Sequence, residues 1–317
     1  MSAPGPSSAS PERKPSEPKS GSALKRLKPV LMVVALCFVA YSAWDLSHRW
    51  QRTRVSLDLR WALASIVPLG LGCLIQARAW IALIERITAR RVPRRAALSL
   101  YMDSQLARYT PGMVGLPVVR MAGAARLSVP ALAVGSSVGL EMLSWTAVGG
   151  ALGFASLFWL PEQSGLTALL GAWAAPIVLG FAGLVLVLSC VDRSHLPAFA
   201  VRALKVSGTG ALVPFSLPLA HVLYWLTWAA HGFLLTRAFG ASSSLALSTS
   251  GLYALATVGG FVALAAPAGV GVREAILSVS LAPALGSAPA LGIAVASRAA
   301  SLCADIVVWA VLKRLRE

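Results

Sequence analysis

Charged residues are scarce in this chain. Only 13% of its 317 residues are Asp, Glu, Lys or Arg, about half the share found in a typical soluble domain. So few charges cannot cover the surface of a water-soluble globule of this size. Hydrophobic residues make up 57% of the chain, and the mean hydropathy is +0.72. The composition therefore predicts an all-α, polytopic helical membrane protein.

Cysteines and acidic residues are also few. The four cysteines lie far apart and form no C-x-x-C pair, so we expect neither a disulfide framework nor a metal site, and no cofactor. The 12 acidic residues leave a formal net charge of +16. The basic residues lie beside apolar runs, which is typical of cytoplasmic loops held against anionic lipid. We therefore expect no nucleic-acid partner.

The apolar runs divide the chain into spans. Residues 1–24 are rich in Ser and Pro, and we expect a disordered cytoplasmic tail there, followed by a single transmembrane domain over 25–317. A spanning helix needs about 20 apolar residues. Six stretches meet that requirement: 28–45, 61–84, 130–158, 166–189, 213–238 and 288–312.

Two further apolar segments, 96–126 and 248–286, are interrupted at their centres by Pro and Gly. Proline removes a helix donor and glycine loosens the backbone, so we expect two re-entrant hairpins instead of straight spans. Each break precedes an arginine, Arg120 or Arg273, and then a long apolar helix with one charge inside it. This order predicts an inverted repeat, with copies at about 96–158 and 248–312.

The loop charges predict how the spans are oriented. Loops 85–95 and 190–212 and the C-terminal tail are basic, whereas loops 159–165 and 239–247 contain no Lys or Arg. The basic loops and both termini should therefore be cytoplasmic, with the two hairpins entering from opposite faces. The arginine-rich segment 46–60 does not fit this scheme. An alternative makes 248–266 a full span and places the C-terminus outside.

Interrupted helices predict where a ligand binds. Unpaired backbone groups are tolerated in a membrane only inside protein or beside a water-filled cavity, so two breaks imply an interior cavity. Helix N-termini and guanidinium groups at the breaks favour an anion, and a lipid phosphate is the anion at hand. The predicted binding residues are Arg108, Tyr109, Pro111, Gly112, Gly115, Arg120, Pro267, Gly269, Gly271 and Arg273.

Four charged residues are candidates for coupling or gating: Glu141, Glu274, Arg298 and Asp305. A charge at the centre of a bilayer costs on the order of 3 kcal/mol, so Glu141 must face the protein interior, paired or protonated. Two interpretations stay open. One is a structural Glu141–Arg298 ion pair that clamps the two copies together, and the other is a switch coupled to a proton or a headgroup.

A weaker hypothesis is an intramembrane serine hydrolase. Residues 135–139 match G-x-S-x-G, and Ser137 has His221 or His231 as a possible base. A nucleophile elbow requires a strand-to-helix turn, however, and this stretch lies in a helical run. The two histidines are ten residues apart in one span, so they should point to different faces.

The ordered motifs resemble the lysylphosphatidylglycerol synthase transmembrane-region family, whose members contain a flippase-like domain. The first motif is Arg108-Tyr109-Thr110-Pro111-Gly112-Met113-Val114-Gly115, followed by Arg120 and Glu141. The second is Pro267-Ala268-Gly269-Val270-Gly271-Val272-Arg273-Glu274-Ala275, followed by Arg298. The family pattern has Lys at the position of Arg108 and often Gly at that of Ala268. The similarity extends over about residues 28–315.

The resemblance implies a membrane module that moves a lipid, or a lipid-linked group, between leaflets of a prokaryotic cytoplasmic (inner) membrane. Lysyl-transfer members carry a soluble synthase domain after the membrane region, and this chain ends at Glu317, so we do not expect an enzyme. The expected partners are membrane lipids, either an anionic phospholipid or a lipid-linked substrate. The alternative is a non-transporting accessory subunit of a lipid-modifying enzyme or glycosyltransferase, with a lipid-synthesising enzyme as its partner.

Overall fold

The computed structural model describes residues 57–109, 114–160, 165–195, 210–263 and 271–314, and no β-strand occurs in these ranges. The predicted tail at 1–24 and the predicted span at 28–45 lie outside them. The α-helices are α2 (Leu59–Ala64), α3 (Ile66–Thr88), α4 (Arg94–Ala107), α5 (Gly115–Ala122), α6 (Ala131–Ala155), α7 (Gly165–Cys190), α9 (Ser216–Ala238), α10 (Ser243–Thr249), α11 (Leu252–Val262), α12 (Val272–Leu285) and α13 (Ser287–Arg314). Short 3₁₀ turns occur at Ala124–Leu127, Ser156–Trp159 and Arg193–His195.

Five helical stretches in the described residues are long and apolar enough to cross a membrane: Leu59–Thr88, Ala131–Trp159, Leu166–Cys190, Ser243–Val262 and Ser287–Arg314. The protein is therefore an all-α, polytopic membrane protein, as its composition predicts. Four of these stretches coincide with predicted spans. The fifth lies at the start of the segment predicted to form the second hairpin.

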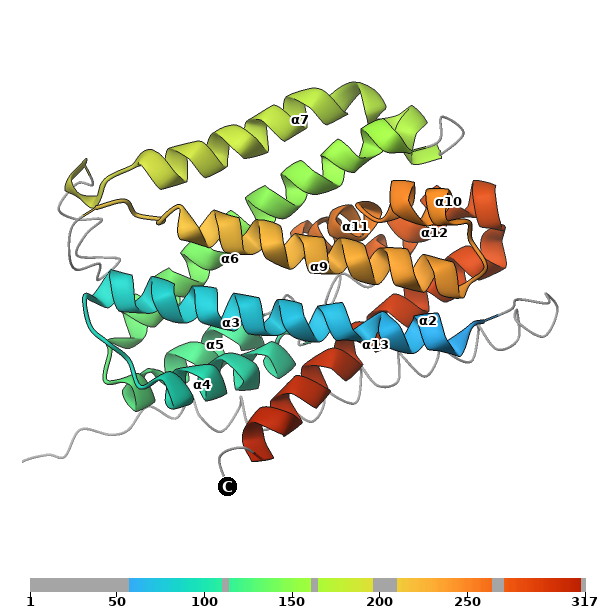
Figure 1. Cartoon of the computed structure of the whole chain (residues 1–317). Coiled ribbons are helices and arrows are strands. Elements are labelled where there is room, and N and C mark those ends of the chain that lie inside the picture. The colour runs from blue at the N-terminus through green and yellow to red at the C-terminus, as the bar shows by residue number, and fades with distance from the viewer. Residues whose placement is uncertain (1–56, 110–113, 161–164, 196–209, 264–270, 315–317) are drawn as a thin grey trace, which may run out of the picture.

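Helix α9 covers the predicted span 213–238 but is not among those five. It carries two histidines, and both are fully buried, as are most of its large aromatic residues. Its polar and aromatic side chains face the interior, where hydrogen-bond partners are available. In Figure 1, α9 lies beside α3, α6 passes behind both of them, and α7 lies on the side of α9 away from α3. The buried polar and aromatic side chains of α9 indicate that it lies inside the bundle.

Helix α7 shows the opposite pattern. It packs mainly on α6, and apart from Leu166 its large side chains are exposed or half-buried, with Leu169 and Leu179 above 70% exposed. Figure 1 shows it at the edge of the bundle. A helix that is apolar on every side and covered on one is suited to lipid contact.

The connections between helices gather at two ends of the bundle. The end of α3, the start of α4, the end of α7 and the start of α9 lie at one end of Figure 1. The end of α6, the start of α7, the end of α9 and the start of α10 lie at the other. The first end is the more basic: Arg86 lies against Gly210 there, beside Arg90 and Arg91. The described helix ends that flank loops predicted to share one side of the membrane therefore share one end of the structure.

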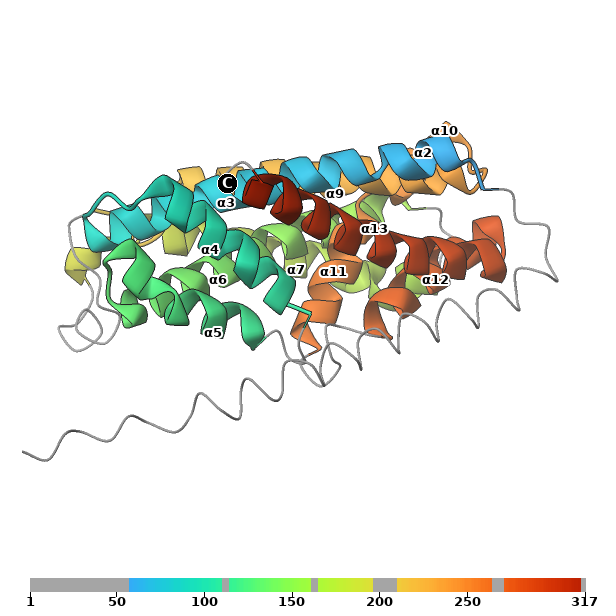
Figure 2. The ribbon, with the colours of Figure 1, turned by 90° about the horizontal axis from the view of Figure 1, so that it is seen from below.

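Both interrupted segments double back on themselves (Figure 2). Helices α4 and α5 pack antiparallel and begin and end at the basic end, with Ser104 of α4 bonded to Arg120 of α5. Helices α11 and α12 also pack antiparallel, with Gly259 against Ile276, and α12 returns to the end at which α10 begins. Helix α13 then runs back along both hairpins.

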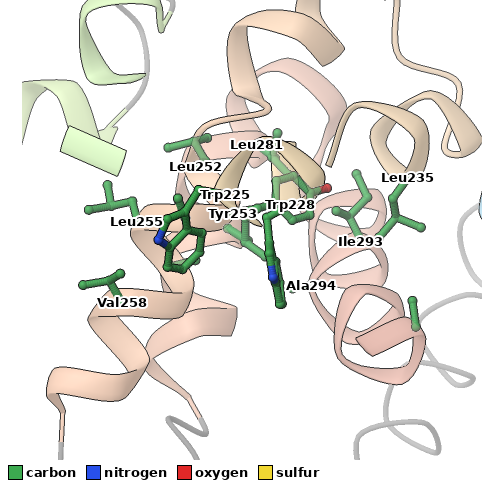
Figure 3. Close-up of a cluster of buried hydrophobic side chains, with 14 of the residues drawn as sticks. Trp225, Trp228, Leu235, Leu252, Tyr253, Leu255, Val258, Leu281, Ile293 and Ala294 are labelled. Carbon is green, nitrogen blue, oxygen red and sulfur yellow. The ribbon is translucent and has the colours of Figure 1, made fainter. Parts of the chain in front are cut away.

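The hydrophobic core forms two clusters of buried side chains. One joins α9 to α11, α12 and α13, and Figure 3 shows its centre around Trp225, Trp228 and Tyr253. The other joins α3 and α4 to the first half of α6. Small residues allow the helices to approach closely: a Cβ added at Gly153 of α6 would lie 2.7 Å from the backbone nitrogen of Leu255 in α11. Such close contacts are typical of helix packing in membranes.

Candidate functional site

A central cavity of about 110 Å³ lies between the two hairpins. Its walls come from α3, α4, α5, α6, α9, α11, α12 and α13. Six of the residues predicted to bind or couple line it: Arg108, Tyr109, Arg120, Glu141, Arg273 and Arg298. Residues nearly 200 positions apart in the chain therefore meet at one site, as the two breaks predict.

The first hairpin contributes an ion pair that is almost completely buried. Arg120 of α5 bonds to Glu141 of α6, and their side chains are 1% and 7% exposed. The Arg120 guanidinium also donates to the Ser104 hydroxyl at 2.8 Å. It lies against the rings of Tyr101 and Trp80, 4.3 and 4.7 Å from their centroids. These contacts hold the guanidinium in a fixed position, since a buried charge needs compensation on every side.

The second hairpin contributes a pair of reversed polarity. Here the carboxylate, Glu274, lies on the hairpin helix α12, and the guanidinium, Arg298, lies on the following long helix α13, 2.7 Å away. The other carboxylate oxygen of Glu274 accepts the backbone N–H of Gly271 at 2.8 Å. Gly271 has a φ of +88°, a conformation that glycine adopts without strain. Glu274 thus caps the start of α12 as well as pairing with Arg298.

A third ion pair joins the first hairpin to α13. Arg108, at the end of α4, donates to Asp305 at 2.6 Å, and the hydroxyl of Tyr109 donates to the same carboxylate oxygen at 2.7 Å. The Cys73 thiol of α3 reaches the other oxygen at 3.2 Å. Asp305 is therefore a shared acceptor that links three parts of the bundle.

Arg273 differs from the other three arginines of the cavity. It is 8% exposed, and no carboxylate lies within ion-pair distance of it in the described residues. Its guanidinium donates to the Ser297 hydroxyl at 2.7 Å, and its Nε is buried without a hydrogen-bond partner there. The ring of Trp228 lies 4.9 Å from the guanidinium carbon. Arg273 thus brings an uncompensated positive charge to the cavity wall.

A buried histidine supports that contact. His231 of α9 bonds through Nε2 to the Ser297 hydroxyl and through Nδ1 to the Ser65 carbonyl, both at 2.9 Å. Since Ser297 accepts from Arg273, its own proton is free for His231 Nε2, and Nδ1–H donates to Ser65. His221 bonds instead to Ser144 of α6 at 3.0 Å. The two histidines therefore serve different contacts, as their spacing predicts.

The remaining predicted residues fall into two groups. Gly115 is the first residue of α5, and Gly271 precedes α12. Pro111, Gly112, Pro267 and Gly269 lie outside the described residues.

The Glu141–Arg298 ion pair considered from the sequence is wrong, because Glu141 bonds to Arg120 and Arg298 to Glu274. Glu141 and Arg298 each pair with an oppositely charged residue on the hairpin helix that precedes their own helix.

Several residues of the site were not predicted: Ser104, Trp228, His231 and Ser297. One signal was available. Ser297 follows Pro267 by 30 residues, the separation at which Glu141 follows Pro111. Ser297 therefore occupies the position in the second copy that Glu141 occupies in the first. In the sequence, only its charged neighbour Arg298 was identified as a candidate.

The arrangement does not provide a hydrolase site around Ser137. This residue lies inside α6 and accepts a bond from the indole nitrogen of Trp80 at 3.0 Å, while its own hydroxyl donates to the Val134 carbonyl. Neither histidine bonds to it in the described residues. In those residues, no group of three His, Cys, Asp or Glu side chains is placed to hold a metal ion.

Comparison with known proteins agrees with the motifs. No curated protein sequence matches the chain. The family model described as lysylphosphatidylglycerol synthase TM region matches residues 26–308, which include both hairpins and every charged residue of the cavity. The chain therefore belongs to the lysylphosphatidylglycerol synthase transmembrane-region family.

Proposed function

We propose that this protein moves an anionic lipid, or a lipid-linked anionic headgroup, between the leaflets of a membrane. The observation that carries the proposal is the cavity between the hairpins, which contains Arg273 without a carboxylate partner in the described residues. An uncompensated guanidinium inside a membrane domain is costly, and a phosphate group relieves that cost by forming charge-assisted hydrogen bonds.

The two hairpins, which start from opposite ends of the bundle, support this function. In an inverted repeat, each half closes the cavity from one side, and rocking of one half against the other exposes a fixed site alternately. We infer that α4–α5–α6 and α11–α12–α13 are the two halves. Arg108 and Asp305 join them, so this pair is the proposed gate, while the pairs at Glu141 and Arg298 hold each half together.

The proposed location is the cytoplasmic (inner) membrane of a prokaryote, with the basic end and both termini on the cytoplasmic side. Arg86, Arg90 and Arg91 gather at this end, which favours retention against anionic lipid. A lipid-synthesising enzyme on that side is the proposed source of substrate. Transport, not enzymatic conversion, is the proposed activity of this chain.

The test uses purified protein in liposomes that contain a trace of lipid labelled on its acyl chain. Dithionite bleaches the label in the outer leaflet, so transport raises the bleached fraction above that of protein-free liposomes. We expect Arg273→Gln to lose most of this activity. Arg78→Gln is the matched control, because Arg78 is exposed on α3 and does not line the cavity. A wild-type protein that moves no lipid class would favour the accessory-subunit function.

A further inference from the structure

We infer that the cavity selects a headgroup with a single negative charge, a phosphodiester, over a phosphomonoester or diphosphate. The inference rests on the proposed function and concerns the charge of its substrate. Among the described residues, four guanidinium groups, of Arg108, Arg120, Arg273 and Arg298, line the cavity, and three carboxylates, of Asp305, Glu141 and Glu274, bond to three of them. Four positive charges against three negative charges leave one positive charge.

The remaining charge is located on one residue. Arg273 bonds to the neutral Ser297, and its Nε has no acceptor in the described part of the chain. The Trp228 ring lies against the guanidinium, with its centroid 4.9 Å from the guanidinium carbon. A guanidinium held in this way offers planar donors to a phosphate, which accepts them in a fork.

The sequence of the breaks does not alter this charge count. Residues 110–113 and 264–270, which join the hairpin helices, contain no Asp, Glu, Lys, Arg or His. The nearest other acid of the first hairpin, Asp103, pairs with Arg126 and accepts the Trp309 indole N–H. It does not line the cavity.

Charge neutrality then decides which headgroup fits. A singly charged phosphodiester at Arg273 makes the complex neutral. A doubly charged headgroup would leave one negative charge without a counter-charge inside the protein, where an unpaired charge is strongly disfavoured. A zwitterionic headgroup carries no net charge, so the occupied site would keep its net positive charge. The cavity therefore distinguishes substrates by total charge, apart from their shape.

The experiment compares three lipids that carry the same labelled acyl chain, in liposomes at pH 8: phosphatidylglycerol, phosphatidic acid and phosphatidylcholine. We expect phosphatidylglycerol to move at least tenfold faster than the other two. Arg273→Gln, which makes the cavity neutral, should abolish that preference and bring the rate of phosphatidylglycerol down to that of phosphatidylcholine. Asp305→Asn, which adds a positive charge, should raise the rate of phosphatidic acid relative to phosphatidylglycerol.

A binding measurement tests the charge selection without transport. Short-chain phosphatidylglycerol should raise the thermal midpoint of the detergent-solubilised protein, and Arg273→Gln should remove that shift. Short-chain phosphatidic acid should give a smaller shift. Dimethyl phosphate, a singly charged phosphodiester without acyl chains, distinguishes a lipid site from a site for a free anion: an equal shift at equal concentration would assign the site to the free anion.

The outcomes separate the two proposals. If no lipid moves but the midpoint rises with phosphatidylglycerol in an Arg273-dependent way, the proposed function is wrong and the charge selection holds. If the lipids move at equal rates and the two variants leave their ratios unchanged, transport holds and the charge selection is wrong.

Discussion

The two hairpins follow the same plan but treat their arginines differently. In the first, Arg120 meets a carboxylate, Glu141, which lies 30 residues after the central proline. In the second, Arg273 meets a hydroxyl, Ser297, which also lies 30 residues after the central proline. The first arginine is neutralised by the protein and the second is not. Under the proposed function, the first hairpin is therefore a fixed support and the second carries the charge that binds the headgroup.

The neighbouring charges extend this contrast. The pair of the second hairpin, Glu274 and Arg298, is reversed in polarity and more accessible, with side chains 14% and 12% exposed. The pair of the first hairpin is enclosed by two aromatic rings. A buried pair of fixed geometry resists change, whereas a more accessible pair adjusts at lower cost. Motion during transport is therefore expected in the second hairpin first.

The largest expected effect comes from breaking the enclosed pair. Glu141→Gln leaves the Arg120 guanidinium buried without its counter-charge, and such a loss costs about 3–5 kcal/mol. We expect a large fall in the thermal midpoint of the purified protein, measured in detergent by intrinsic fluorescence. Replacing both residues with Met should recover most of this loss, because an apolar pair of similar volume leaves no charge unpaired.

The second hairpin supplies the matched control. Glu274→Gln also removes a carboxylate from an ion pair, but this pair is more accessible than the first, and we expect a loss of only about 1–2 kcal/mol. A midpoint that falls as far as that of Glu141→Gln would contradict the division into a fixed and an adjustable hairpin.

The two breaks and the charged residues around them could be predicted from the sequence, because their signals are local. Proline and glycine at residues 111–115 and 267–271 indicate the two breaks, and charges inside apolar helices indicate which residues face the cavity. The choice of partner was not predictable in the same way. Glu141 and Arg298 both line the cavity. Each nevertheless pairs with a residue of the adjacent antiparallel helix. Which residues face each other depends on how the helices are rotated about their axes, and the sequence alone does not give that rotation.

Ser297 was missed for a different reason. Serine is common in membrane helices, where it permits close packing or bonds to the preceding turn. Its importance here depends on what it faces, namely Arg273 on one side and His231 on the other. Only the packing of α9, α12 and α13 brings these three together, and that packing depends on long-range contacts.

The next largest effect concerns the contact between the two halves. Gly153→Ala places a Cβ 2.7 Å from the Leu255 nitrogen, so α6 and α11 must separate, at a cost of about 1–3 kcal/mol. Gly139→Ala on the same helix meets nothing within 4 Å, and we expect it to be neutral or slightly stabilising, since alanine favours helix. Thermal midpoints of the two variants check this. Equal losses would show that the close approach of α6 to α11 is not limiting.

A smaller effect is expected when the second hairpin is made to resemble the first. Ser297→Asp supplies a carboxylate to Arg273 and removes the free positive charge of the cavity. We expect the transport of phosphatidylglycerol in liposomes to fall about tenfold, which corresponds to about 1.4 kcal/mol. Ser297→Ala is the control, because it removes the hydroxyl but keeps the charge, and it should retain more activity. A Ser297→Asp protein with full activity would contradict the role assigned to the charge of Arg273.

The smallest effect tests how rigid the support in the first hairpin is. Ser137→Ala removes the acceptor of the Trp80 indole N–H, and Trp80 in turn packs against Arg120. Leaving that donor buried without a partner costs about 1 kcal/mol. We expect a small drop in the thermal midpoint and an unchanged rate of lipid transport, because Arg120 keeps its bonds to Glu141 and Ser104. Loss of transport with a normal midpoint would restore Ser137 as a candidate nucleophile and would show that the first hairpin does more than support the second.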